Sequence, residues 1–124
     1  MAIHSINHVQ LPFPAGEEGA MRAFYAGLLG LAEVRYPAEN ALHFAAGPQR
    51  IALVPTTRWQ PAPAAAHLAF EVDNLPELRG RLLQAELSLV ENRALPGYLR
   101  FYVKDPAGNQ LEFLEPDAEA GAFV

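Results

Sequence analysis

The sequence of 124 residues contains no cysteine, which excludes disulfide bonds, thiolate metal ligands and a cysteine nucleophile. No apolar run approaches the roughly 20 residues that a transmembrane helix needs. The first residues, MAIHSINH, lack the basic and apolar segments of a secretory signal. Basic residues are few, and the net charge of −5 argues against nucleic acid or an anionic membrane as a partner. A soluble, cytoplasmic protein is therefore expected.

What the sequence does contain is enough apolar material for a core, since 51% of its residues are hydrophobic. The length fits one compact unit, or two small units that share a core. Alternation and i, i+3, i+4 spacing predict the following elements in order: a strand over 3–13, a helix over 18–31, and strands over 32–36, 41–45 and 50–54. After a proline- and alanine-rich stretch, the same order recurs: a strand over 66–72, a helix opened by a capping box of Asn74 and Glu77, a strand over 88–93, and a hairpin over 98–116.

The chain is thus predicted to be an internal duplication of a strand–helix–three-strand module. The first module covers residues 1–55, a linker 56–65, the second module 66–116, and an acidic tail 117–124. The fold class is α+β, with each helix on one face of its own sheet. His8 and His67 occupy corresponding places in the two modules, and Ala52 corresponds to Glu112.

Glu112 is the residue that most needs explaining. It lies in the last predicted strand, among Leu111, Phe113 and Leu114. A carboxylate in an apolar strand costs free energy unless it is solvated, paired or bound to a cation. His8 and His67 are expected on strand faces turned away from the helices. Two neutral imidazoles and a carboxylate suit Fe(II), Mn(II), Zn(II) or Ni(II), and three protein ligands leave positions open for substrate.

At this point the chain resembles the vicinal oxygen chelate superfamily, which includes glyoxalases, extradiol dioxygenases, fosfomycin-modifying thiol transferases and bleomycin resistance proteins. The matching segments are INHVQL, FYAGLLGL, HLAFEV and DPAGNQLEFLEP. The resemblance implies two βαβββ modules that form a cup-shaped, open β-barrel with the helices outside. It also implies a divalent metal ion inside the cup, with His8, His67 and Glu112 as ligands.

One departure from the family pattern limits the reactions that the resemblance implies. Glyoxalase I-like members have a fourth ligand, and the corresponding residue here is Ala52, which has no donor atom. The three remaining ligands resemble the set of extradiol dioxygenases, and fosfomycin-modifying enzymes use a similar set with Mn(II). Bleomycin-binding members use the same cup without metal.

Other polar residues are expected to face the cavity. Strand alternation places Arg100 and Tyr102 together, opposite an apolar set. Tyr102 is a candidate catalytic residue that donates or accepts a proton, and Arg100 a candidate for binding a carboxylate or phosphonate. Gln10 and Glu71 lie on the histidine faces, where they can contact the substrate or orient the ligands.

Two functional classes follow. The first is a metal-dependent enzyme acting on a small molecule, dioxygenase-like or glyoxalase-like. The second is a metal-free protein that binds and sequesters a drug or metabolite. His4 and His43 are expected to be surface or structural residues. For Arg100 and Tyr102, the alternative to a role in the cavity is a position on a solvated edge of the sheet. Because a single module would expose half a cup, a homodimer is expected.

Overall fold

The computed structural model describes residues 1–36, 40–63 and 65–118 of the chain. Contacts divide the chain into two units, Met1–Pro61 and Ala62–Val124. The division falls inside the predicted linker, although residue 56 belongs to the last strand of the first unit. Most of the predicted tail, from residue 119 on, lies outside the described residues. In the described part, none of the helices has the length and apolar character needed to span a membrane.

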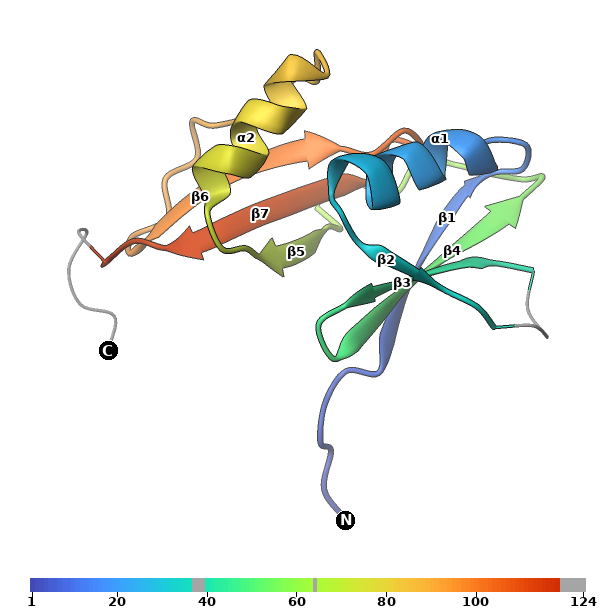
Figure 1. Ribbon diagram of the computed structural model, residues 1–124. Helices are drawn as coiled ribbons and strands as arrows, with labels where there is room; N and C mark the ends of the chain where they lie inside the picture. Colours follow the sequence, from blue (N-terminus) through green and yellow to red (C-terminus); the bar gives the residue numbers. More distant parts are fainter. Residues whose placement is uncertain (37–39, 64, 119–124) are drawn as a thin grey trace. The chain divides into compact units, whose positions relative to one another are not determined.

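The first unit is a four-stranded sheet with a helical segment on one face (Figure 1). The strands follow the order β1-β4-β3-β2, and β1 pairs with β4 in parallel while the other pairs are antiparallel. The elements are β1 (His8–Pro14), α1 (Glu18–Arg22), η1 (Ala23–Leu28), β2 (Ala32–Val34), β3 (Leu42–Ala46) and β4 (Gln49–Thr56). This is the predicted strand–helix–three-strand order.

The first strand is shorter at its start and longer at its end than predicted. It begins at His8, which pairs with Arg50 of β4, and the carbonyl of the preceding residue, Asn7, accepts a hydrogen bond from the amide of Arg50 at 3.2 Å. At the other end it continues through Pro12 to Pro14. Proline donates no backbone hydrogen bond, but β1 is an edge strand and can carry proline without breaking a ladder on both sides.

The helix predicted over 18–31 is two pieces. A short α-helix passes into a π-helical segment, in which the amide of Leu29 donates to the carbonyl of Phe24 at 2.9 Å. The wider turn accompanies the packing of two adjacent aromatic rings, Phe24 and Tyr25, which are both buried and meet edge to face at 5.1 Å. Gly30 directly follows Leu29, the residue that caps the C-terminal end of the segment, and has a φ of 75°, which a glycine adopts readily.

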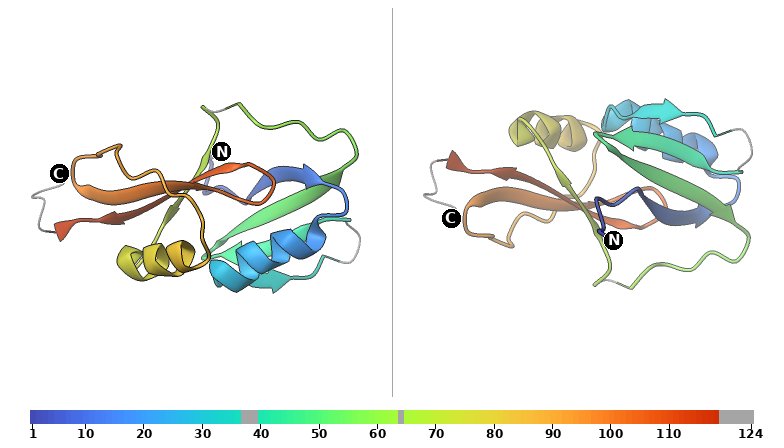
Figure 2. Two further views of the ribbon diagram at one scale, coloured as in Figure 1. Left: turned by 90° about the horizontal axis from the view of Figure 1, so that it is seen from above. Right: turned by 90° about the horizontal axis from the view of Figure 1, so that it is seen from below.

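The second unit is a three-stranded sheet in the order β5-β7-β6, with one helix on one face (Figures 1 and 2). Its elements are β5 (Leu68–Glu71), α2 (Leu75–Gln84), β6 (Tyr98–Lys104) and β7 (Gln110–Pro116). Asn74 caps α2 as predicted: its side chain accepts a hydrogen bond from the amide of Glu77. The predicted hairpin is present as β6 and β7, joined by a loop in which Asp105 accepts from the amides of Ala107 and Asn109.

The strand predicted over 88–93 is wrong in extent. A single residue, Val90, pairs with β6, exchanging two hydrogen bonds of 2.9 Å with Tyr102. The following residues are poor strand formers: Asn92 is disfavoured in sheets and Pro96 has no amide hydrogen. Glu91 is also held by Arg79 of α2. One bridge therefore replaces the first of the three strands expected after the helix of this module.

Strand register separates an apolar and a polar face in each sheet. In the second unit, Phe101 pairs with Phe113, which also pairs with Phe70, and the three rings pack together. On the opposite face Glu112 pairs with both Ala69 and Tyr102. In the first unit, Ala52 pairs with Gln10 and His43 in the same way. Ala52 and Glu112 therefore occupy equivalent positions, and so do His43 and Tyr102.

Candidate functional site

Glu112 lies in the middle of the central strand of the second sheet, between β5 and β6. Its neighbours along the strand, Leu111 and Phe113, face the helix and are fully or nearly fully buried. Alternation turns the carboxylate to the other face, where the side chain is only 8% exposed. The carboxylate is therefore poorly solvated and must obtain its hydrogen bonds from the protein.

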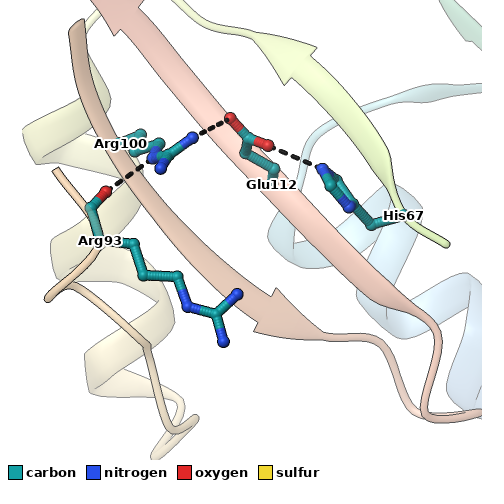
Figure 3. Close-up of polar contacts among 4 residues, drawn as sticks. All are labelled: His67, Arg93, Arg100 and Glu112. Carbon is teal, nitrogen blue, oxygen red and sulfur yellow. Dashed lines mark hydrogen bonds and ion pairs between the residues drawn. The ribbon is translucent and has the colours of Figure 1, made fainter. Parts of the chain in front are cut away.

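Two cationic or ionisable side chains meet the two oxygens of Glu112 (Figure 3). Nε2 of His67, one residue before β5, is 2.9 Å from Oε1. Nη1 of Arg100, on β6, is 3.4 Å from Oε2. The contact places His67 and Glu112 on the same face of the sheet, where strand alternation in the sequence predicts them.

Arg100 is fixed at a second point. Its Nε donates to the backbone carbonyl of Arg93 at 2.7 Å, in the segment that precedes β6. The guanidinium is thus held between a backbone acceptor and the Glu112 carboxylate. This arrangement fixes the direction of the Glu112 side chain.

Tyr102 lies beside the same pair. It is buried, and its ring meets the His67 ring edge to face at a centroid distance of 5.5 Å. The guanidinium carbons of Arg93 and Arg100 each lie 5.3 Å from the centre of the Tyr102 ring. The second unit therefore brings together His67, which precedes β5, Arg100 and Tyr102 of β6, and Glu112 of β7.

The other predicted site residues lie apart from this group or make no contact with it. His8 is the first residue of β1, in the first unit, and its Nδ1 is 2.9 Å from Oδ1 of Asn7. Gln10 and Glu71 are exposed and lie on the histidine-bearing faces of their sheets. In the described part of the chain, neither side chain forms a hydrogen bond or ion pair.

The His67–Glu112 pair has the chemistry and spacing of two metal ligands. Two atoms that bind one ion at about 2.0–2.2 Å and at right angles to each other lie about 3 Å apart, close to the observed 2.9 Å. The contact of His8 with Asn7 leaves Nε2 for another partner, and a ligating imidazole commonly donates its other nitrogen to an oxygen in this way. Among the residues that the structure describes, no three histidine, aspartate or glutamate side chains lie close enough together to hold a metal ion.

The first sheet carries polar residues that sequence reasoning missed. His43 is buried, 1% exposed, and its ring lies 4.6 Å from that of Tyr36. The guanidinium of Arg50 stacks on the same tyrosine at 4.1 Å and donates to its hydroxyl at 2.6 Å. The available signal was the repeat itself, because His43 occupies the place of Tyr102. Ala52 provides no ligand on this face.

Comparison with known proteins places this duplicated α+β chain in a class. The family model of the Glyoxalase/Bleomycin resistance protein/Dioxygenase superfamily matches residues 5–113. The chain therefore belongs to this superfamily, as its motifs predict. A search of curated proteins found no match.

Solved structures agree with this assignment. A glyoxalase family protein from Bacillus anthracis is 35% identical, with a TM-score of 0.87 over 94% of this chain and 98% of that one. A lactoylglutathione lyase from Agrobacterium tumefaciens is 24% identical, with a TM-score of 0.74 over 93% and 96%. TnmS3, an antibiotic-binding protein from Streptomyces sp. CB03234, is 19% identical, with a TM-score of 0.73 over 94% and 99%. The last two show a shared fold alone.

Proposed function

We propose that this protein is a metal-dependent enzyme of the superfamily that acts on a small molecule. The observation that carries the proposal is the His67–Glu112 contact: an imidazole and a poorly solvated carboxylate, 2.9 Å apart on the sheet face that lies opposite the apolar core. The third ligand is His8, which corresponds to His67 in the repeat. When bound, a divalent ion such as Fe(II), Mn(II), Zn(II) or Ni(II) supplies Lewis-acid chemistry to two adjacent oxygens of a substrate.

The protein residues around the ion have separate roles. Arg100 holds one oxygen of Glu112, which leaves the other oxygen directed toward His67. Tyr102, against the His67 ring, provides a hydroxyl that donates a hydrogen bond or a proton to a substrate oxygen. Gln10 and Glu71 contact the substrate from the edges of the two sheets. Because Ala52 removes a fourth ligand, the site favours a three-ligand reaction, dioxygenase-like or a related addition or isomerisation, over lactoylglutathione lyase chemistry.

A second candidate function is metal-free binding of a drug or metabolite. The observation that favours it is that Glu112 already has two partners in the protein, His67 and Arg100, so that the carboxylate needs no ion to be stable. In that case the same polar residues form the floor of a binding site. TnmS3, the antibiotic-binding relative in fold, shows that the fold accommodates such a role in another protein.

Metal titration separates the two candidates. We expect protein purified without chelator to bind about one Mn(II) or Fe(II) ion per chain, measured by elemental analysis and calorimetry. His67→Ala and Glu112→Gln should remove this binding, whereas Asp73→Asn, which replaces an exposed carboxylate in the same unit, should retain it. Full-strength binding in Glu112→Gln, or no binding of any of the four metals by the natural sequence, contradicts the enzyme proposal.

We also propose a homodimer in the cytoplasm. A single module would expose half a cup, and association is the usual way to cover such a surface. Sedimentation at micromolar concentration is the test, with a mass of about twice the 13.5 kDa of one chain as the expected result.

A further inference from the structure

The second unit contains a cavity whose lining includes none of the three proposed metal ligands. Its volume is about 490 Å³, which lies within the usual range of small-molecule sites. All of its lining residues belong to the second unit. They come from the segment after α2 and from the facing ends of β6 and β7.

The cavity is lined by two cations that have no carboxylate partner in the described part of the chain. Arg93 contacts the Tyr102 ring, and its guanidinium makes no hydrogen bond there. Lys104, at the end of β6, is the single lysine of the sequence. Glu86 is the one acidic residue of the lining, and no ion pair joins it to either cation. In a protein of net charge −5, such a concentration of free positive charge in a cavity favours an anion.

The rest of the lining is apolar or neutral. Leu87, Val90 and Val103 provide apolar surface, and Ser88 and Gln110 provide neutral hydrogen-bonding groups. A ligand that fits this lining carries an anionic group for Arg93 and Lys104 and a short apolar body. A guanidinium binds a planar carboxylate or a tetrahedral phosphonate through two parallel hydrogen bonds.

The cavity and the metal site share one residue. Tyr102 lines the cavity, while its ring also contacts the ring of His67. We propose that this cavity binds the anionic end of the substrate, a carboxylate or phosphonate on an apolar body, so that the reactive end reaches across Tyr102 toward His67 and Glu112. This assignment of a substrate class rests on the proposed function, but anion binding in the cavity does not require the metal.

The single lysine allows a direct test. The full-length protein, treated with EDTA, is acetylated with the uncharged reagent N-acetoxysuccinimide, and the modification of Lys104 and of the N-terminal amine is followed separately by peptide mass. Phenylphosphonate and phenylacetate are the anionic probes, and benzyl alcohol is the uncharged control. We expect both anions to slow acetylation of Lys104 by about tenfold at ten times their dissociation constant, and to leave the N-terminal amine unchanged.

Variants show whether the protection arises in the cavity. Arg93→Gln retains the backbone carbonyl that Arg100 needs, and should raise the anion concentration for half-protection by roughly tenfold or more. Arg35→Gln removes the same charge from an exposed position in the other unit and should change nothing. Protection by only one of the two anions would support the site and identify its head group. No protection up to tens of millimolar, equal protection by benzyl alcohol, or protection unchanged in Arg93→Gln would overturn the proposal, and none of these results depends on metal binding.

Discussion

Arg100 and Glu112 form the ion pair around which the polar face of the second sheet is built. The side chains are 17% and 8% exposed, so neither is fully solvated. Removal of one partner from such a pair leaves the other with an unpaired charge, whereas removal of both leaves no charge to compensate. If Arg100 holds Glu112 in position, replacing Arg100 alone should therefore cost more stability than replacing both residues together. If Arg100 is only a solvated edge residue, no such difference is expected.

We therefore predict that Arg100→Met lowers the free energy of unfolding of the metal-free protein by about 1–3 kcal/mol. The double variant Arg100→Met/Glu112→Gln should recover most of this loss, since its carboxamide carries no charge. Urea denaturation of the four proteins of this cycle measures the coupling. Strictly additive effects would show that the two side chains act independently.

At the scale of elements, Glu115 joins β7 to α2. Its two carboxylate oxygens accept hydrogen bonds from the amides of Asn74 at 2.7 Å and of Leu75 at 3.0 Å, at the start of α2. The first amides of a helix have no partner within it, and a negative charge there is favourable. Glu115 thus supplies a second cap in addition to the Asn74 side chain.

Glu115→Gln should therefore lower the free energy of unfolding by about 1 kcal/mol. Glu71→Gln is the matched control, because Glu71 is an exposed carboxylate on the neighbouring strand β5 and should cost less than about 0.5 kcal/mol. Thermal and urea unfolding of both variants give the comparison. Equal effects in the two variants would argue against the cap.

A second contact joins α2 to the segment after it. Arg79 donates hydrogen bonds to both carboxylate oxygens of Glu91, which lowers the pKa of Glu91 below its ordinary value of 4.5 and raises the pKa of Arg79. A carboxyl group with a lowered pKa in the folded state binds its proton less readily than in the unfolded state. Its contribution to stability is therefore present above pH 4.5 and lost as the pH falls through the folded pKa.

We predict that the difference in melting temperature between the natural sequence and Arg79→Gln is largest near pH 7 and shrinks as the pH falls from 4.5 to 3. Arg79 remains charged throughout this range, so the change comes from Glu91. Calorimetry at a series of pH values is the measurement. A difference that stays constant over the whole range would contradict this origin.

Sequence patterns predicted the elements well where local chemistry dominates. The loop at Asp105 and Asn109, the Asn74 cap and the Gly30 helix end all follow from residue types that favour one local conformation. Prediction was wrong where tertiary contacts decide: the start of β1 depends on where β4 begins, and the strand over 88–93 is reduced to one bridge.

Part of the candidate site could also be predicted from the sequence, and part could not. His67 and Glu112 could be found because the repeat and the alternation of two strands identify their face. The second contact of Arg100, with the Arg93 carbonyl, could not be found, because it depends on the path of an irregular segment. Arg93 lies in that segment and carries no sequence signal, whereas Lys104 follows the alternation of Tyr102.

At the scale of the whole molecule, the duplication distributes the proposed ligands between two units. The second unit holds His67 and Glu112, and the first holds His8 at the corresponding place in its own sheet. Ala52, which has no donor atom in its side chain, occupies the position in the first unit that Glu112 occupies in the second. The proposed metal site therefore depends on His8 as its one ligand from the first unit.

The most direct test is the affinity of His8→Gln for Mn(II), measured by calorimetry against the natural sequence, with His4→Gln as the matched control. His4 is exposed and precedes β1, so its replacement should leave metal affinity unchanged. We predict that His8→Gln weakens Mn(II) binding by more than about 100-fold, because loss of a direct ligand costs more affinity than loss of a hydrogen bond that supports a ligand. Natural affinity in His8→Gln would show that this side chain does not share an ion with His67 and Glu112.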